Sequence, residues 1–521
     1  VAGSHRDYLR IQYGGDDKLF VPTDQVGLLQ KYIGAEGTAP RLHRMGTADW
    51  ARARAKAQKS VEDIADKLLE IYAERQLAKG HAFTPDDAGQ REFEEAFPYQ
   101  ETDDQLRAVA EIKRDMESEK PMDRLLCGDV GFGKTEVAIR AAYKAVMDHK
   151  QVAVLVPTTV LAQQHFQTFS ARFADFGVSV DVICRFRSAK EQKATIERLE
   201  ANKVDVLIGT HAILNQKRVH FSDLGLLIVD EEQRFGVKQK EKIKKLAAGV
   251  DVLTLSATPI PRTLAMTFYA DLDVSVIDEL PPGRQPVTTK LIADSRRDQV
   301  VENVGRWVAE GRQAYWVCPL VEESEALDLQ NAIDTREQLQ AALPQVRTGL
   351  VHGRLSAAEK DEVMAAFKAG ELDLLVATTV IEVGVDVPNA SLMVIEHAER
   401  FGLSQLHQLR GRVGRGTAQS LCVLLYRHPP GAIARERLAT MRETQDGFEI
   451  ARRDLELRGP GELLGARQSG AMLLRFADLG RDAPLVDIAH ALSERLLEAR
   501  PDVVEAHLDR WLRRRERFLD A

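Results

Sequence analysis

The sequence predicts an α/β protein with two parallel β-sheets in tandem, and three observations support this. Short β-branched runs alternate with helical segments from about residue 98 to 265, and the pattern starts again from about 285 to 428. Strands separated by helices form parallel sheets that are covered on both faces. A glycine-rich loop with phosphate-binding spacing directly follows one of the first strands. The segment Glu279–Arg284 contains two prolines and a glycine and is typical of a linker between the two sheets.

Eleven apolar, β-branched runs are the strand candidates, six in the first sheet and five in the second. Each run is short, as expected for strands that are buried on both faces. The candidates are Leu125–Cys127, Val152–Val156, Val178–Cys184, Val204–Ile208, Leu226–Val229, Val252–Leu255, Ala314–Cys318, Leu350–Val351, Leu374–Ala377, Leu392–Ile395 and Leu421–Leu425.

The regions on either side of the two sheets have different patterns. Residues 6–33 alternate like a β-hairpin around the turn Gly14–Asp17. A helical stripe follows Ser60 and ends near Gly80, and the chain after 429 is mostly helical. We therefore expect five regions: a partial β module in 1–35, a linker with a long helix in 36–96, the first α/β domain in 97–280, the second in 281–428, and a helical C-terminal region in 429–521.

Composition narrows the class of protein. The 521 residues carry 71 basic and 79 acidic side chains, a formal net charge of −8. This balance excludes a globally basic nucleic-acid coat but allows a local basic groove. No apolar run approaches the ~20 residues that span a membrane, so we expect a cytoplasmic protein without a membrane partner. Widely spaced cysteines exclude a disulfide framework and favour buried thiols at Cys127, Cys184, Cys318 and Cys422.

The strongest local motif is the run Gly128-Asp-Val-Gly-Phe-Gly-Lys-Thr135, which matches GxxxxGK[ST]. It follows a strand candidate and precedes a helical segment, the context in which this pattern binds phosphates. Gly128, Gly131 and Gly133 allow backbone N–H groups to surround phosphate oxygens at a helix N-terminus. Lys134 is expected to neutralise the β- and γ-phosphates of ATP, and Thr135 to ligate Mg²⁺.

Two carboxylates follow another strand candidate, at the sheet edge where ligands bind in open α/β folds. Asp230 and Glu231 come directly after the apolar run Leu226–Val229. Asp230 is expected to hold Mg²⁺, and Glu231 to orient and deprotonate the attacking water; an acidic helix cap is the alternative. Gln105 has an amide suited to an adenine edge, and Ser256–Pro259 supplies hydroxyls that suit sensing of the nucleotide state.

Arginines and glycines are interleaved in Gln405–Gly416, near the end of the second α/β region. Arginine binds phosphate through two coplanar donors and stays charged. Arg412 and Arg415 are therefore expected to reach the γ-phosphate as arginine fingers from the facing domain; a basic surface loop is the alternative. Gly384 and Asp386 follow a strand of the same region, and Asp386 is expected to touch the ribose or an arginine finger.

Hydroxyl, amide and imidazole side chains follow several strands of both regions. Such donors suit contacts to a nucleic-acid backbone, which position the ligand without reading its sequence. Ordinary helix N-caps are the alternative for each. The candidates are Thr158, Thr159, Gln164, Thr210, His211, Thr378 and Thr379.

These motifs, in this order, resemble the superfamily-2 helicases and translocases, whose motor consists of two RecA-like domains. The resemblance covers most of residues 97–428. Residues 6–262 are similar to the transcription-repair coupling factors (Mfd), and this similarity rests on Met122–Glu136, Arg185–Gln192 and Asp230–Gly236.

Residues 265–521 look more like the branched-DNA helicase family RecG, on the strength of Thr267–Asp273, Val276–Arg284 and Arg312–Cys318. The whole resembles a hybrid of the two families, such as a chimera joined near Ser256–Arg262. Three residues match a translocation motif that both families share: Arg458, Arg467 and Gln468.

The resemblance implies an ATP-dependent translocase on double-stranded DNA, with ATP and Mg²⁺ as cofactors and a monomer as the working form. It implies a role in DNA repair or in remodelling stalled complexes. It also implies the RNA polymerase β subunit as a partner, although residues 1–35 resemble only the second half of the polymerase-interacting domain. Two alternatives remain open: a polymerase-binding module whose motor is incidental, and a helicase that unwinds forks.

Overall fold

The computed structural model describes residues 8–12, 18–22, 79–247, 249–257, 272–282, 286–319, 325–378, 387–414, 419–458, 482 and 484–508. The chain divides into two compact units, one formed by residues 1–78 and 464–471 and the other by 79–463 and 472–521. In the first unit, β1 (Tyr8–Gln12) pairs antiparallel with β2 (Lys18–Pro22). This confirms the predicted hairpin. The helix predicted before Gly80 lies outside the described residues.

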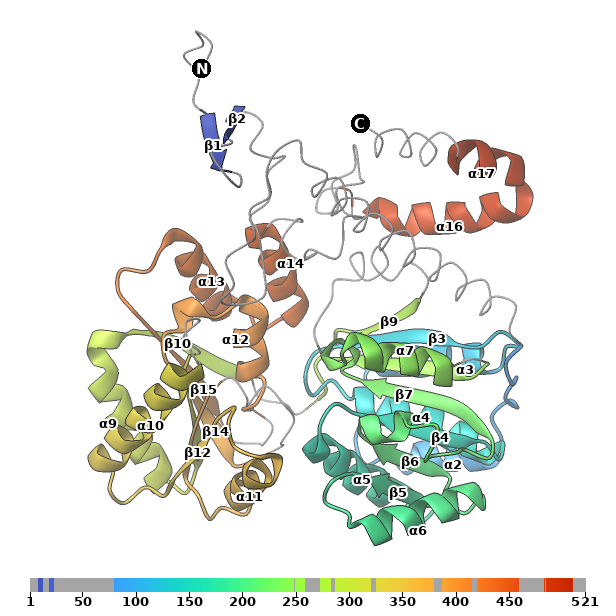
Figure 1. Ribbon diagram of the computed structural model, residues 1–521, viewed down its shortest axis with the longest axis horizontal. Helices are drawn as coiled ribbons and strands as arrows, with labels where there is room; N and C mark the ends of the chain where they lie inside the picture. Colours follow the sequence, from blue (N-terminus) through green and yellow to red (C-terminus); the bar gives the residue numbers. More distant parts are fainter. Residues whose placement is uncertain are drawn as a thin grey trace. The chain divides into compact units, whose positions relative to one another are not determined.

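The second unit contains both predicted parallel sheets (Figure 1). The first has seven strands in the order β5-β6-β4-β7-β8-β3-β9, and every described pairing is parallel. Its strands are β3 (Asp123–Gly128), β4 (Gln151–Leu155), β5 (Val180–Ile183), β6 (Val206–Gly209), β7 (Leu224–Asp230), β8 (Asp251–Ser256) and β9 (Asp273–Ile277).

Helices bury both faces of this sheet, because alternate strand residues belong to different core clusters. Val152 and Val154 of β4 pack with α2 (Ala88–Glu95), α3 (Asp103–Met116), α4 (Lys134–Met147) and α5 (Thr159–Phe173). Ala153 and Leu155 pack on the other face with α7 (Val237–Leu246), and α6 (Ala189–Glu200) covers that face beside β5 and β6. Strands buried on both faces lack polar alternation, which explains their continuous apolar sequences.

The second sheet has six strands in the order β10-β15-β14-β11-β13-β12, all parallel. They are β10 (Val287–Ala293), β11 (Gln313–Val317), β12 (Thr348–Val351), β13 (Leu374–Ala377), β14 (Ala390–Ile395) and β15 (Ser420–Tyr426). One face packs with α9 (Arg297–Ala309) and α10 (Glu325–Ala342). The other packs with α11 (Ala357–Lys368), α12 (Leu403–Arg410), α13 (Ala432–Glu443) and α14 (Gly447–Arg458).

Each of the eleven predicted strands overlaps a strand of the structure, and two strands were missed. β9 and β10 are edge strands that carry polar residues such as Ser275 and Lys290. Edge strands of this kind lack the continuous apolar run of a central strand. The chain passes from one sheet to the other between β9 and β10, which brackets the predicted segment Glu279–Arg284.

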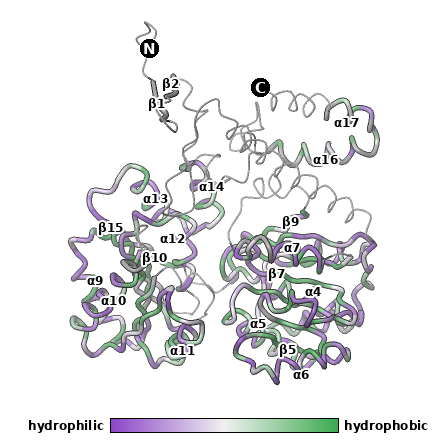
Figure 2. The backbone as a smooth tube through the Cα atoms, in the orientation of Figure 1, coloured by the Kyte–Doolittle hydropathy of each residue, from purple (hydrophilic) through white to green (hydrophobic). Residues whose placement is uncertain are grey.

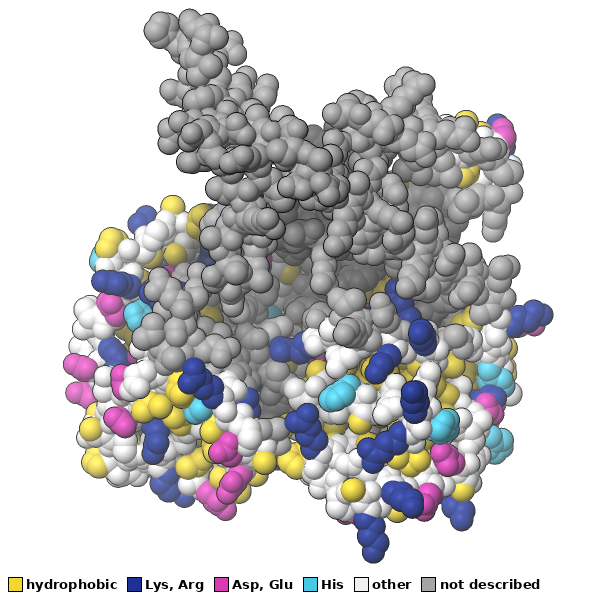
Figure 3. Space-filling view, viewed as in Figure 1, with side chains coloured by type: hydrophobic (Ala, Val, Ile, Leu, Met, Phe, Trp, Pro, Cys, Tyr) yellow, Lys and Arg dark blue, Asp and Glu magenta, His cyan; other side chains and the backbone are white. Residues whose placement is uncertain are grey.

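The interior and the surface follow the expected division. Figure 2 shows hydrophobic residues along the strands and hydrophilic residues in many of the loops. All four cysteines are buried and free, as predicted, and burial raises the pKa of Cys127, Cys318 and Cys422 to about 12. In Figure 3, Lys and Arg side chains are numerous on the visible face of the domain with the first sheet. Within the described residues, no helix combines the length and apolarity needed to cross a membrane. Beyond the second sheet, α16 (Pro484–Ala499) and α17 (Pro501–Leu508) confirm a helical tail.

Arg140 of α4 is a buried cation on which this domain depends. It donates to Glu101 (2.7 Å) and to Glu136 (3.0 Å), and it is only 2% exposed. Truncating Arg140 removes the cation paired with Glu101 and one of two cations beside Glu136, which keeps Arg172 at 3.1 Å; losing one member of a buried ion pair is strongly destabilising. We therefore expect Arg140→Ala to lower the free energy of unfolding by about 3 kcal/mol, measured by denaturant unfolding.

The matched control is Lys193→Ala, which removes an exposed ion pair with Glu197 at 3.8 Å. That change should cost less than about 0.5 kcal/mol. Equal losses for the two variants would contradict a structural role for the Arg140 network.

Candidate active site

The phosphate-binding pattern forms the loop between β3 and α4. β3 ends at Gly128, and α4 begins at Lys134. Gly131 and Gly133 have φ angles of 80° and 82°, the left-handed region that glycine adopts without steric cost. A Cβ atom on Gly133 would lie 2.2 Å from Nε2 of Gln105, so both the angle and the space require glycine here.

Lys134 is folded back into its own loop. Its Nζ donates to the carbonyl oxygens of Gly128 (2.7 Å) and Asp129 (2.8 Å). Burial lowers the pKa of Lys134, while the carboxylates of Asp129, Asp230 and Glu231 act in the opposite direction. The ammonium group therefore lies among acceptors that a nucleotide phosphate can replace.

The two predicted carboxylates lie at the carboxyl end of β7. Asp230 is its last residue, and Glu231 follows with a φ of 53°. The Glu231 N–H donates to the Leu255 carbonyl of β8 (3.0 Å), and its Oε1 accepts from the Ala257 N–H (3.1 Å). The predicted run Ser256–Pro259 thus begins in contact with Glu231. Burial and the charge of Asp230 raise the pKa of the Glu231 carboxyl, which favours proton acceptance by that group.

Thr135 and Asp230 are the oxygen donors suited to Mg²⁺. The described residues contain no cluster of three or more His, Cys, Asp or Glu side chains able to hold a metal ion by themselves. Mg²⁺ characteristically uses one or two protein oxygens and completes its shell with phosphate oxygens and waters. A hydroxyl at the start of α4 and a carboxylate at the end of β7 therefore fit Mg²⁺ bound together with a nucleotide.

Gln105 lies against the phosphate loop, and its amide is occupied by protein partners. Its Nε2 donates to the Phe132 carbonyl (2.9 Å), and its Oε1 accepts from the Thr102 N–H (3.0 Å) in a capping box at the start of α3. Recognition of adenine, as predicted, stays a prediction and requires this amide to exchange partners.

The second sheet contributes Arg412 in the turn that follows α12. Its backbone N–H donates to the Leu409 carbonyl (3.0 Å), and the neighbouring Gly411 lies against Val130 of the phosphate loop, 3.4 Å from an ideal Cβ. His407 of α12 donates from Nε2 to Asp129, with 2.8 Å to each carboxylate oxygen. The arginine-bearing segment therefore contacts the phosphate loop. Of the residues predicted for the second sheet, four lie outside the described residues: Arg415, Gly384, Asp386 and Thr379.

The predicted DNA-contacting residues of the first sheet follow β4 and β6, which are neighbours. Thr158 is the N-cap of α5 and accepts from the Leu161 N–H (3.3 Å), so the helix-cap alternative describes it as well. Gln164 lies further along α5, while Thr210 and His211 follow β6 directly. Because parallel strands end at one edge, the β4 and β6 groups share the edge that carries the phosphate loop.

The remaining candidates are divided between the second sheet and the C-terminal region. Thr378 follows β13, and its buried Oγ1 has no hydrogen-bond partner among the described residues. Arg458 is the last residue of α14. Arg467 and Gln468 lie outside the described residues.

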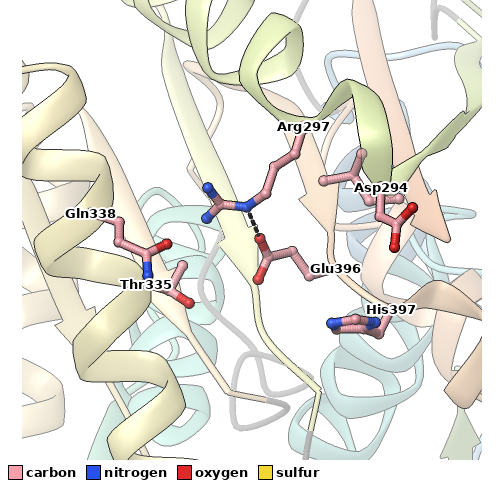
Figure 4. A pocket seen from close by; sticks show the side chains of 7 residues that line it. Asp294, Arg297, Thr335, Gln338, Glu396 and His397 are labelled. Carbon is pink, nitrogen blue, oxygen red and sulfur yellow. Dashed lines mark hydrogen bonds and ion pairs between the residues drawn. The ribbon is translucent and has the colours of Figure 1, made fainter. Parts of the chain in front are cut away.

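Sequence reasoning missed three polar contacts. The sequence places His407 as a singly standing hydrogen-bonding residue and His165 of α5 beside Gln164 among the candidate nucleic-acid contacts, yet His165 Nε2 lies 3.0 Å from Asp230 Oδ2. A pocket of about 190 Å³ also opens beside the second sheet, where Arg297 and Glu396 point toward one another at 2.6 Å (Figure 4). Arg297 and Glu396 come from separate elements, so no local sequence pattern indicates their contact or this pocket.

Comparison with protein families agrees with this architecture. The family described as DEAD/DEAH box helicase matches residues 102–267, and the helicase conserved C-terminal domain matches 296–417. The C-terminal part of RecG domain 3 matches 444–516, and the CarD-like/TRCF RID domain matches 1–33.

Individual relatives cover most of the chain. The transcription-repair-coupling factor of Bacillus subtilis is 50% identical across 90% of this chain and 40% of its own length. That of Staphylococcus epidermidis is 47% identical across 98% of this chain and 44% of its own length. A structure of RecG bound to a three-way DNA junction has a TM-score of 0.66 and 41% identity, covering 82% of this chain and 57% of RecG.

This chain therefore spans less than half the length of these coupling factors. The match to the Staphylococcus protein covers 98% of the chain and runs through residues 256–262, while the second half also matches the C-terminal part of RecG domain 3. Both superfamily-2 helicase domains are thus present on two parallel sheets, and over most of its length the chain is similar to the transcription-repair coupling factors and to RecG.

Proposed function

We propose that this chain is an ATP-driven translocase on double-stranded DNA that acts in DNA repair or in remodelling stalled complexes. The observation that carries the proposal is the placement of Lys134, Asp230 and Glu231 at one edge of a parallel sheet. A buried cation, a carboxylate suited to Mg²⁺ and a carboxyl group whose pKa is raised are the groups that phosphoryl transfer to water requires.

In ATP hydrolysis, each residue of the site has a separate role. Lys134 exchanges its two carbonyl partners for phosphate oxygens, and the N–H groups of the loop surround the remaining charge. Thr135 and Asp230 would hold Mg²⁺, which when bound would supply positive charge to the phosphates. Glu231 orients water and accepts its proton. Arg412 and Arg415 supply guanidinium groups from the second domain.

DNA contact is proposed at the edge residues that follow β4, β6 and β13. Their hydroxyl and amide groups suit phosphates, so binding should be independent of sequence and weaken as salt rises. Arg458, Arg467 and Gln468, by their resemblance to the translocation motif, are proposed to couple closure of the two domains to movement on the duplex.

The first test is Lys134→Ala, with ATPase rates measured with and without linear duplex DNA. The parent should be stimulated by DNA, and the variant should lose hydrolysis because the ammonium group that contacts the β- and γ-phosphates is gone. Circular dichroism should show an unchanged fold. Hydrolysis by this variant at the parent rate would remove Lys134 from the site.

The glycine cradle gives a second test. Gly133→Ala should weaken binding of a fluorescent ATP analogue at least tenfold, because its Cβ collides with Gln105 Nε2 at 2.2 Å and φ is 82°. The double variant Gly133→Ala/Gln105→Ala removes the collision and leaves backbone strain of about 1–2 kcal/mol. Because Gln105 is itself a candidate adenine contact, the double variant is compared with Gln105→Ala, and Gly133→Ala should cost less affinity in that background than in the parent. Full affinity in the single variant contradicts the cradle.

Coupling is tested separately with Arg467→Ala. This variant should keep measurable ATPase activity but lose displacement of a triplex-forming strand from duplex DNA. Displacement at the parent rate excludes the coupling role of Arg467.

Binding to RNA polymerase is a second candidate, favoured by the β1–β2 hairpin and by the match of residues 1–33 to the CarD-like/TRCF RID domain. Retention of the polymerase β subunit on the immobilised chain without ATP supports it, and loss of retention after Leu9→Asp in the hairpin locates the contact. A fork-unwinding assay tests the third alternative.

A further inference from the structure

His165 connects the helix that carries candidate DNA contacts to the end of the strand that carries the Mg²⁺ ligand. It lies in α5, seven residues after the N-cap Thr158. Its Nε2 lies 3.0 Å from Oδ2 of Asp230, the last residue of β7. β7 pairs directly with β4, the strand from which α5 follows. The imidazole therefore spans from one strand–helix unit to the neighbouring strand end.

The hydrogen-bond chemistry assigns the tautomer of His165. A carboxylate oxygen only accepts, so the proton on the imidazole lies on Nε2, and the ring donates it to Asp230. Nδ1 is buried and has no partner among the described residues. The side chain is 9% exposed.

Packing alone does not account for an imidazole at this position. The ring lies 6.0 Å from that of Phe169, centroid to centroid, on the buried face of α5 with Ala162 and Phe173. An aliphatic side chain would fill comparable space without burying a nitrogen that lacks a partner, which costs about 1–3 kcal/mol. The bond to Asp230 is the contact that an aliphatic residue cannot make.

We propose that His165 is a positioning residue that holds the Asp230 carboxylate in the orientation required for Mg²⁺ and makes that orientation depend on α5. This inference rests on the proposed function, which it deepens by naming how DNA acts on the ATP site. Groups that hold a metal ligand by hydrogen bonds typically contribute 10–100-fold to metal affinity or activity.

The helix supplies the mechanical connection. Thr158 and Thr159, the candidate phosphate contacts, lie about 9 Å along the helix axis from His165, at ~1.5 Å per residue. A hydrogen bond of 3.0 Å is lost when the heavy atoms separate beyond about 3.5 Å. A shift of α5 by roughly half an ångström, driven by DNA phosphates at its N-terminus, therefore makes or breaks the contact with Asp230.

The test compares His165→Gln with His165→Asn. The Gln amide nitrogen reaches about as far as imidazole Nε2, whereas the Asn amide nitrogen is shorter by one methylene. Both are polar and uncharged, so they differ mainly in whether a donor reaches Asp230. Phe169→Leu is the control, because it alters the packing beside His165 and leaves the donor in place.

Three quantities are measured for each variant: thermal unfolding, the Mg²⁺ concentration needed for half-maximal binding of a fluorescent ATP analogue, and kcat and KM for ATP with duplex DNA. His165→Asn should raise the Mg²⁺ requirement about tenfold and lower the DNA-stimulated kcat 10–100-fold, with KM changed less than kcat. His165→Gln should restore both quantities to within a few fold of the parent. Phe169→Leu should lower thermal stability while the Mg²⁺ requirement stays at the parent level.

Two results would overturn the proposal: a parental Mg²⁺ requirement in His165→Asn, or equal impairment of the Gln and Asn variants. If the Asn variant does not fold, the Gln variant is measured alone. A Mg²⁺ requirement in the Gln variant far above that of the parent then contradicts a role for the Nε2 donor. If the parent protein shows no DNA-stimulated ATPase activity, the proposed function is contradicted. The Mg²⁺ titration of nucleotide binding still decides the role of His165, so the two failures are distinguishable.

Discussion

Parallel pairing among β3, β8 and β7 is the constraint on which the candidate site depends. The register aligns Cys127 with Ser256, and Asp230 with Leu255. Since parallel strands end at the same edge, the phosphate loop after β3 and the carboxylates after β7 meet although about a hundred residues separate them. Burial of both faces by helices keeps these strands in register.

Burial then determines the electrostatics of that edge. Lys134 and Asp129 are both buried, and an isolated charge there would be costly. Lys134 is satisfied by two carbonyl oxygens, and Asp129 by His407 and by the Val130 N–H at 2.6 Å. Burial raises the pKa of Asp129, but the hydrogen bond and charge of His407, the Val130 N–H and the charge of Lys134 together outweigh it and hold this pKa below its usual range. The loop is thus preorganised around charge before any phosphate arrives.

Sequence alone predicted the two sheets, eleven of their strands and the residue types of the phosphate loop, because each depends on local patterns such as apolar runs and glycine spacing. It missed β9 and β10, whose polar edge positions weaken the strand pattern. It also missed His165 with Asp230 and His407 with Asp129, which are 65 and 278 residues apart. Contacts of that separation depend on strand order and helix placement, and these cannot be obtained from spacing within one motif. Gln105 was predicted in part: it was expected to belong to the nucleotide site, but its contacts with Phe132 and Thr102 were not.

Two histidines bind the two carboxylates of the candidate site, His165 to Asp230 and His407 to Asp129. His165 lies on a helix that packs on the first sheet, and His407 on a helix that packs on the second. Arg410 donates to Nδ1 of His407 (3.1 Å), so the His407 proton lies on Nε2 and is donated to Asp129. Lys134 also donates to the Asp129 carbonyl. In the proposed function, a phosphate that takes Lys134 from this carbonyl therefore acts on Asp129, whose carboxylate binds His407 of α12. His165 links Asp230 to α5 in the same way, by a hydrogen bond from its imidazole. In the proposed function, events at the phosphates reach one helix on each sheet through one histidine–carboxylate contact, and a contact of this kind has two discrete states, made or broken. That property is what a motor needs to convert a bound phosphate into a displacement.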